Sequence, residues 1–230
     1  MIPRFALSLY QLSTWILPLV IAITFHEASH GFVARLFGDD TAWRMGRVTF
    51  NPLKHIDPFG TVLLPALLMV MRAPFLFGYA KPVPVNFRAL RNPKRDSVFV
   101  AAAGPAMNLA LAILSALLFR LVPFLPPDAA RWAADNLSNA LLINVLLAVF
   151  NLLPIPPLDG GRILVGLLPK GPSRALASLE PYGMLILIAA LLILPVLGAQ
   201  SGLDLNFVWQ LVVRLTDAIT GAILRITGAG

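Results

Sequence analysis

Long apolar stretches dominate the chain, and the polar residues between them are gathered in a few short segments. Crossing the hydrocarbon core of a bilayer takes about 20 apolar residues in a helix. Stretches of about that length or more predict five membrane-spanning helices, at about 6–37, 98–122, 137–153, 181–199 and 206–226. The first stretch resembles a signal peptide, but it continues unbroken to residue 37, so we expect an uncleaved first span.

The region 38–97, between the first two spans, has a different pattern. Residues 38–40 (Gly-Asp-Asp) are expected to end the first helix, and residues 41–50 are rich in β-branched and aromatic types. That composition predicts a short strand or hairpin, which could hold a substrate by main-chain pairing. Residues 59–77 are apolar but interrupted, so they form either a sixth span or a re-entrant segment. The interrupting residues are Pro65, Arg72 and Pro74.

The basic residues favour the re-entrant alternative for 59–77. If this segment crosses, ten Lys and Arg side chains lie in loops on one side of the membrane and six on the other. If it returns, fourteen lie on one side, against Arg4, Arg120 and Arg131 on the other. The positive-inside rule favours the larger contrast and places the more basic side in the cytoplasm. We therefore expect an external N-terminus and a cytoplasmic 38–97 region.

Composition supports the membrane class. Of 230 residues, 58% are hydrophobic and 13% charged, and the mean hydropathy is +0.80. A soluble domain of this length could not bury so much apolar surface. We expect one all-α, multi-pass membrane domain over 1–230, with a core at about 6–165 and C-terminal helices at about 181–226. The net charge of +7 fits basic loops at anionic lipid headgroups, so no nucleic-acid partner is expected.

A polar cluster lies inside the first apolar stretch. Residues 26–30 read His-Glu-Ala-Ser-His, an H-E-x-x-H pattern. On a helix, His26 and His30 are one turn apart on one face, so both imidazoles can reach one Zn²⁺. Glu27 borders that face, where it can take a proton from water at the metal. Ionisable residues at membrane depth are costly, which favours a functional role over simple packing.

Asp159 is a second acidic residue at membrane depth. The prolines at 154, 156 and 157 cannot continue a helix, so the span that starts near Leu137 must unwind before it. Because a catalytic zinc usually has three protein ligands, Asp159 is the best candidate for the third. The alternative is an N-cap for a helix that begins near Arg162. A re-entrant 59–77 segment places His30 and Asp159 at similar depth.

Together these motifs resemble the site-2 protease family of intramembrane zinc metalloproteases, in the compact form without a PDZ or CBS (cystathionine-synthase-like) domain. The matching segments, in chain order, are 25–31, 51–58, 80–85, 103–108 and 151–161. The resemblance implies one Zn²⁺ per chain bound by His26, His30 and Asp159, with Glu27 activating water. By position, Asn151 is similar to the family's asparagine that steadies the oxyanion.

The resemblance also implies the substrate class and the location. The expected substrate is a transmembrane or membrane-proximal segment of another membrane protein, cleaved in regulated intramembrane proteolysis. We expect a bacterial-type cell (inner) membrane with the active site towards the cytoplasm. The particular substrate, the trigger and the oligomeric state do not follow from the sequence.

Several alternatives stay open. Asn151 can instead cap carbonyls that the prolines free, and His55 is either a further metal contact or a structural hydrogen-bonding residue beside Asp57. A transporter is a rival function, but the H-E-x-x-H and Asp-Gly-Gly segments have no counterparts elsewhere in the chain. A non-catalytic metal-binding protein is a second rival, and the intact Glu27 argues against it.

Overall fold

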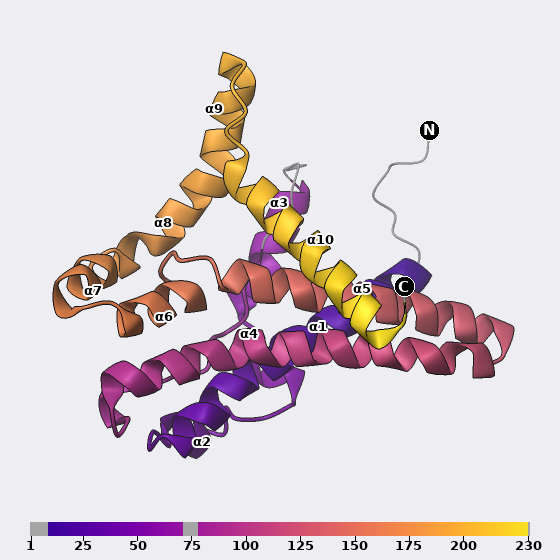
Figure 1. Cartoon of the computed structure of the whole chain (residues 1–230), viewed down its shortest axis with the longest axis horizontal. Coiled ribbons are helices and arrows are strands. Elements are labelled where there is room, and N and C mark those ends of the chain that lie inside the picture. Colours follow the sequence, from indigo (N-terminus) through magenta and orange to yellow (C-terminus); the bar gives the residue numbers. More distant parts are fainter. Residues whose placement is uncertain (1–8, 71–77, 230) are drawn as a thin grey trace.

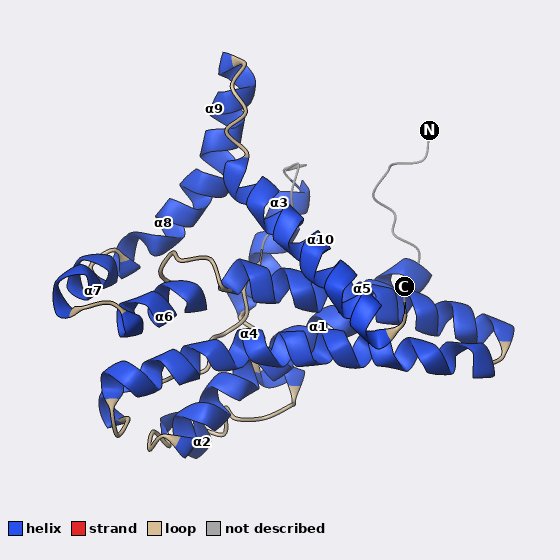
Figure 2. Cartoon of the chain, viewed as in Figure 1, coloured by secondary structure: helices blue, strands red, loops and turns tan. Residues whose placement is uncertain are grey.

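The computed structural model describes residues 9–70 and 78–229 (Figure 1). All regular structure within those residues is helical, and they contain no β-strand (Figure 2). The α-helices are α1 (Leu9–Leu36), α2 (Thr41–Arg44), α3 (Leu64–Val70), α4 (Pro93–Leu118), α5 (Pro127–Asn151), α6 (Asp159–Leu167), α7 (Lys170–Ala177), α8 (Gly183–Ile188), α9 (Leu194–Ser201) and α10 (Phe207–Thr227).

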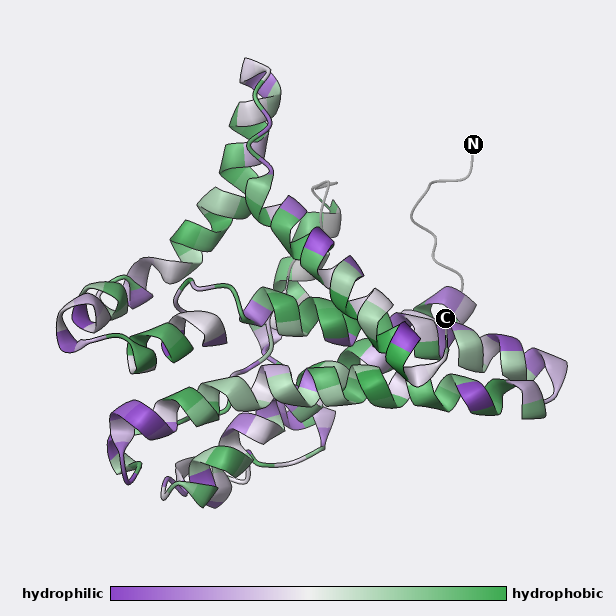
Figure 3. Cartoon of the chain, in the orientation of Figure 1, coloured by the Kyte–Doolittle hydropathy of each residue, from purple (hydrophilic) through white to green (hydrophobic). Residues whose placement is uncertain are grey.

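Five helical stretches among the described residues are long and apolar enough to cross a membrane, which confirms the five predicted spans. They are Leu9–Leu36, Pro93–Phe124, Pro127–Asn151, Lys170–Ser201 and Phe207–Thr227. Apolar residues run along each of them (Figure 3). Large apolar side chains such as Leu17, Leu114 and Leu142 are exposed on the surface, as expected of helices that face lipid. The chain is therefore an integral, multi-pass membrane protein.

The centre of the molecule is a bundle of three helices, α1, α4 and α5, each of which packs against the other two, with α10 lying across α5 (Figure 1). Small residues line the contacts: Ala22, Ala112 and Ala148 are completely buried. In a membrane, helices associate mainly through close packing, and small side chains let their backbones approach. This bundle carries the site, because α1 and α4 hold most of the site residues and α6 packs against α4.

The hairpin predicted at 41–50 is not confirmed. Residues 41–44 form the single turn α2, and residues 45–50 form turns and bends. The buried Asp39 carboxylate accepts from the backbone N–H of Thr41 (3.0 Å) and of Asn86 (2.6 Å). An ion pair between Arg44 and Asp40, one turn apart at 2.6 Å, adds to the helical turn. These contacts of Asp39, one local and one to a residue 47 positions away, thus outweigh the strand propensity of the side chains.

The two ends of the apolar 59–77 segment meet in space. The Tyr79 N–H donates to the Gly60 carbonyl at 3.1 Å, and the Thr61 hydroxyl donates to the Tyr79 carbonyl at 2.9 Å. A membrane crossing would separate these ends by about 30 Å. The described residues on either side of 71–77 thus lie close together, as a re-entrant segment requires. Residues 71–77, including Arg72 and Pro74, lie outside the described residues.

Candidate metal centre

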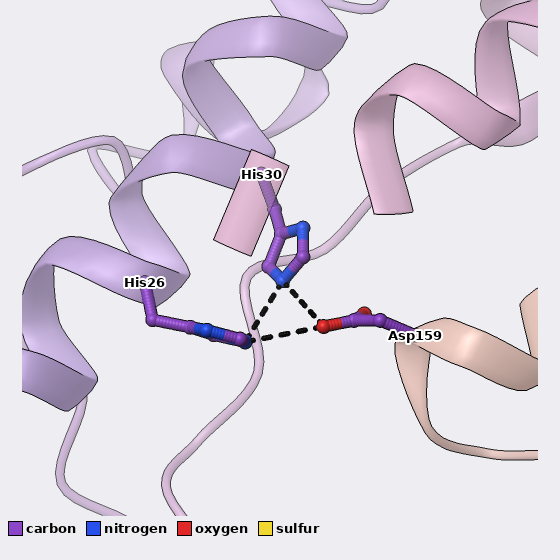
Figure 4. Close-up of side chains that lie close together, drawn as sticks. All are labelled: His26, His30 and Asp159. Carbon is purple, nitrogen blue, oxygen red and sulfur yellow. Dashed lines mark hydrogen bonds and ion pairs between the residues drawn. The ribbon is translucent and has the colours of Figure 1, made fainter. Parts of the chain in front are cut away.

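Three side chains from two helices converge on one point. His26 and His30 lie on α1, and Asp159 is the first residue of α6 (Figure 4). The Nε2 atoms of the two histidines are 3.1 Å apart. The Asp159 Oδ2 atom lies 3.3 Å from Nε2 of His26 and 3.4 Å from Nε2 of His30. All three residues are buried. The structure thus brings together the three metal ligands predicted from the sequence.

Hydrogen bonds on the far side of each imidazole orient its Nε2 atom. Nδ1 of His26 lies 2.6 Å from Oδ1 of Asn108, and Nδ1 of His30 lies 2.7 Å from the Val100 carbonyl. Both partners are acceptors, so each Nδ1 carries the proton and each Nε2 of a neutral ring presents a lone pair. Two lone pairs 3.1 Å apart cannot bond to each other. A cation bound by both relieves this contact.

The spacing of the three atoms fits a zinc ion. Ligand atoms about 2.0–2.1 Å from a tetrahedral Zn²⁺ lie about 3.3–3.4 Å from one another. The measured separations, from 3.1 to 3.4 Å, agree with that geometry. Oδ2 of Asp159 is also buried without a hydrogen-bond partner among the described residues. Two imidazoles and one carboxylate form a ligand set typical of catalytic zinc, which keeps a fourth position open.

The break after α5 places Asp159. Helix α5 ends at Asn151, residues 152–158 form turns, and α6 begins at Asp159 itself instead of near Arg162. The N-cap position is Leu158, and Oδ2 of Asp159 has no hydrogen-bond partner among the described residues, which argues against the N-cap alternative. A Cβ on Gly160 would lie 2.2 Å from the Leu152 carbonyl oxygen. Glycine is therefore required for α6 to start this close to the preceding turn.

Gly104 of α4 lies directly against the two histidines. A Cβ at this position would lie 2.5 Å from Cε1 of His26 and 2.5 Å from Nε2 of His30. Helix α4 also supplies the Val100 carbonyl and the Asn108 amide that hold the rings. The groups next to Gly104 are thus the two rings of the cluster, and a glycine makes room for them.

Glu27 is half-buried and is held by a segment that sequence reasoning did not connect to it. The Val83 N–H donates to Oε2 of Glu27 at 2.8 Å. Val83 lies between two prolines that have no N–H, so it is the only backbone donor of residues 82–84. The Arg47 guanidinium holds this segment by donating to the carbonyls of Lys81 (2.9 Å) and Pro82 (3.3 Å). In the sequence, the Pro-Val-Pro pattern at 82–84 marks Val83 as a single backbone donor, but it does not say which residue accepts the bond.

Two other candidate residues make only structural contacts among the described residues. The Asn151 amide donates to the Leu147 carbonyl at 3.0 Å in the last turn of α5. Nε2 of His55 lies 2.9 Å from the Thr49 carbonyl oxygen, and His55 is not part of the three-residue cluster. Its partner is therefore Thr49 and not the neighbouring Asp57, which caps the turn that follows it.

With this geometry established, comparison with known proteins decides the family. The chain matches Peptidase family M50 over residues 14–131 and 124–195. It belongs to Peptidase family M50, the site-2 protease family. The M50 match covers most of α1 to α9 and includes every residue of the cluster. The chain is therefore a membrane peptidase of this family.

The names of similar curated proteins from bacteria and archaea agree with this family assignment. The chain is 39% identical to "Putative zinc metalloprotease YwhC" of Bacillus subtilis, over 75% of this chain and 77% of the relative. It is 35% identical to "Putative zinc metalloprotease Rip2" of Mycolicibacterium smegmatis, over 78% of this chain and 66%, or about two thirds, of the relative. It is 30% identical to "Putative zinc metalloprotease MJ0611" of Methanocaldococcus jannaschii, over 70% of this chain and 73% of the relative. No solved structure matches the chain.

Proposed function

We propose that this M50 peptidase is an intramembrane zinc endopeptidase that cleaves a transmembrane or membrane-proximal segment of another membrane protein, in regulated intramembrane proteolysis. The observation that carries the proposal is the three-atom cluster of His26, His30 and Asp159, with Glu27 beside it, on a helix long enough to span the membrane. The relatives' names and the family match support the same metal and the same class of reaction.

In this proposal the three clustered side chains bind one zinc ion and Glu27 is not a ligand. Zinc supplies a Lewis acid and makes water acidic enough to lose a proton near neutral pH. The Glu27 carboxylate is anchored through Oε2 to the Val83 N–H. Oε1 has no hydrogen bond in the described part of the chain and can receive that proton. Glu27 then gives the proton to the leaving amine.

Asn151 is proposed to stabilise the developing oxyanion. It ends α5, eight residues before Asp159, so it borders the same unwound segment. Its side-chain amide has two N–H donors, and the bond to the Leu147 carbonyl uses one of them. The second N–H can donate a hydrogen bond to a substrate oxygen. The structural alternative, in which Asn151 only caps α5, is tested below.

The orientation of the protein is part of the same proposal. The larger number of basic residues, with the 38–97 region, faces the cytoplasm under the positive-inside rule. His30 lies six residues from the end of α1, and Asp159 follows the end of α5. The site is then near the cytoplasmic face of a bacterial-type inner membrane, and a substrate helix must unwind locally to expose its peptide bond.

Co-expression with candidate single-span membrane proteins tests the proposal. Each candidate carries tags at both ends, and its fragments are followed with wild-type chain and with Glu27→Gln. We expect at least one candidate to be cut by the wild type and left whole by Glu27→Gln, with the cut inside or next to its apolar span. Cutting of the same candidate by Glu27→Gln contradicts the assignment of the base.

A further inference from the structure

The imidazole of His26 is held from behind by a buried network of two asparagines on two other helices. Oδ1 of Asn108, on α4, lies 2.6 Å from Nδ1 of His26. Nδ2 of Asn108 donates to the Ala22 carbonyl (3.2 Å) and to Oδ1 of Asn144 on α5 (2.8 Å). Nδ2 of Asn144 donates to the Ala140 carbonyl at 2.9 Å. Asn108 is 0% and Asn144 2% exposed, so water does not compete for these bonds.

These bonds determine which way each amide points. The Ala140 carbonyl can only accept, so Asn144 turns its NH₂ towards it and its oxygen towards Asn108. Asn108 then meets two acceptors, the Ala22 carbonyl and the Asn144 oxygen, on its NH₂ side. Its own oxygen must therefore face His26, and Nδ1 of His26 must carry the proton.

We propose that Asn108 and Asn144 are positioning residues that hold His26 in the Nδ1–H tautomer, with its Nε2 lone pair aimed at the metal position. The inference rests on the proposed function, because it assumes that His26 binds zinc. Neither asparagine touches the metal position. Asn144 acts only through Asn108, and Asn108 acts only through His26.

The two histidines differ in the kind of group that contacts Nδ1. A main-chain carbonyl of α4 holds His30, and a carbonyl can only accept a hydrogen bond. His26 is held by a side-chain amide, which can present either oxygen or NH₂ after a half-turn. If NH₂ faced Nδ1, the ring would take the opposite tautomer and Nε2 would carry a proton in place of the lone pair. Asn144, together with the Ala22 carbonyl, opposes that half-turn, because both accept from the Asn108 NH₂.

A matched pair of substitutions separates positioning from packing. Asn144→Leu removes one of the two acceptors that orient Asn108 and leaves the longer bond to the Ala22 carbonyl. The control is Asn136→Leu, because Asn136 is also a buried asparagine of α5, and it also donates to a carbonyl one turn earlier (Trp132, 2.9 Å). No hydrogen bond links Asn136 to His26 among the described residues. Both substitutions therefore remove a bond from an asparagine amide to a carbonyl one turn earlier, but only Asn144→Leu disturbs the hydrogen bonds behind His26.

The first readout is zinc affinity, measured on the purified full chain by competition with a chelator. Loss of an outer contact to a metal-binding histidine lowers affinity by about 10- to 100-fold. We expect a loss of that size for Asn108→Leu and a smaller loss in the same direction for Asn144→Leu. Asn136→Leu should retain wild-type affinity. Asn144→Leu decides the question even if Asn108→Leu does not fold.

The second readout needs no metal. The chain has three histidines, so nitrogen NMR of metal-free, histidine-labelled protein gives three imidazole patterns, and His26→Gln identifies one. We expect a protonated Nδ1 in the wild type and in Asn136→Leu, and a shift towards the Nε2–H tautomer in Asn144→Leu. If Asn144→Leu and Asn136→Leu leave the His26 tautomer identical, the proposal is wrong. A wild type without zinc affinity would instead overturn the proposed function, and the tautomer result would still stand.

Discussion

A methyl group at position 104 should weaken zinc binding without unfolding the protein. The Cβ of alanine would lie 2.5 Å from Cε1 of His26 and 2.5 Å from Nε2 of His30. Unbonded atoms of this kind are normally about 3.5 Å or more apart. The overlap of about 1 Å falls on the ends of two side chains, which move more easily than the backbone of α4. Because those ends carry the metal-facing nitrogens, their displacement separates Nε2 of both rings from Asp159.

The size of the effect follows from the overlap. Forcing a methyl group into a packed site costs about 1–3 kcal/mol. If that cost falls on the zinc-bound state, the Kd for zinc rises by about 5- to 150-fold, since 1.4 kcal/mol is a factor of ten. Alanine also favours the helix by about 0.8–1 kcal/mol over glycine. The melting temperature of the metal-free protein should therefore change little, while the rise in melting temperature on adding zinc becomes smaller.

The control for Gly104→Ala is Gly221→Ala in α10. A Cβ at position 221 would meet only the end of the Arg225 side chain, at 3.7 Å, so it gains the helix preference without the overlap. Zinc Kd is measured for the wild type and both variants by chelator competition, and melting is followed with and without zinc. Wild-type zinc affinity in Gly104→Ala would refute the claim that Gly104 makes room for the metal-facing rings.

Three further predictions concern the site and the topology. Asp159→Ala should lose both zinc and activity, because it removes a proposed ligand, and normal zinc content in this variant would contradict that role. Asn151→Ala should lower the cleavage rate by about 100-fold or more with zinc and melting temperature unchanged if it steadies the oxyanion. If it only caps the last turn of α5, zinc, stability and activity should fall together, and an active, zinc-loaded variant removes it from the site. Single cysteines at positions 45 and 92, in a chain without native cysteine, should resist labelling from outside the cell. External labelling at either position contradicts the proposed orientation.

The sequence predicted that His26, His30 and Asp159 lie together because their placement depends on local rules. The helical period sets His26 and His30 on one face, and the closely spaced prolines at 154, 156 and 157 cannot continue α5, so the chain turns before Asp159. The charge of the loops favours a re-entrant 59–77 segment without any knowledge of packing, and the contact between Gly60 and Tyr79 agrees with that prediction.

Other features could not be predicted because distant contacts decide them. Residues 41–50 have strand-forming side chains, but Asp39, which is bonded to an N–H 47 positions along the chain, starts a helical turn there. The contact between Glu27 and Val83 joins residues 56 positions apart. The partner of Asn108 across the bundle, Asn144, depends on how α4 and α5 are rotated against each other. No short pattern of residues encodes such rotations.

Zinc content and cleavage rate of purified Glu27→Gln, measured on one sample, test the central claim most directly. Glutamine keeps the size of the side chain and can still meet the Val83 N–H through its carbonyl oxygen, but it cannot take a proton from water. We predict one zinc per chain, as in the wild type, and no detectable cleavage of a single-span protein that the wild type cuts. A Glu27→Gln variant that is free of zinc yet active, or zinc-loaded and as fast as the wild type, would contradict the account.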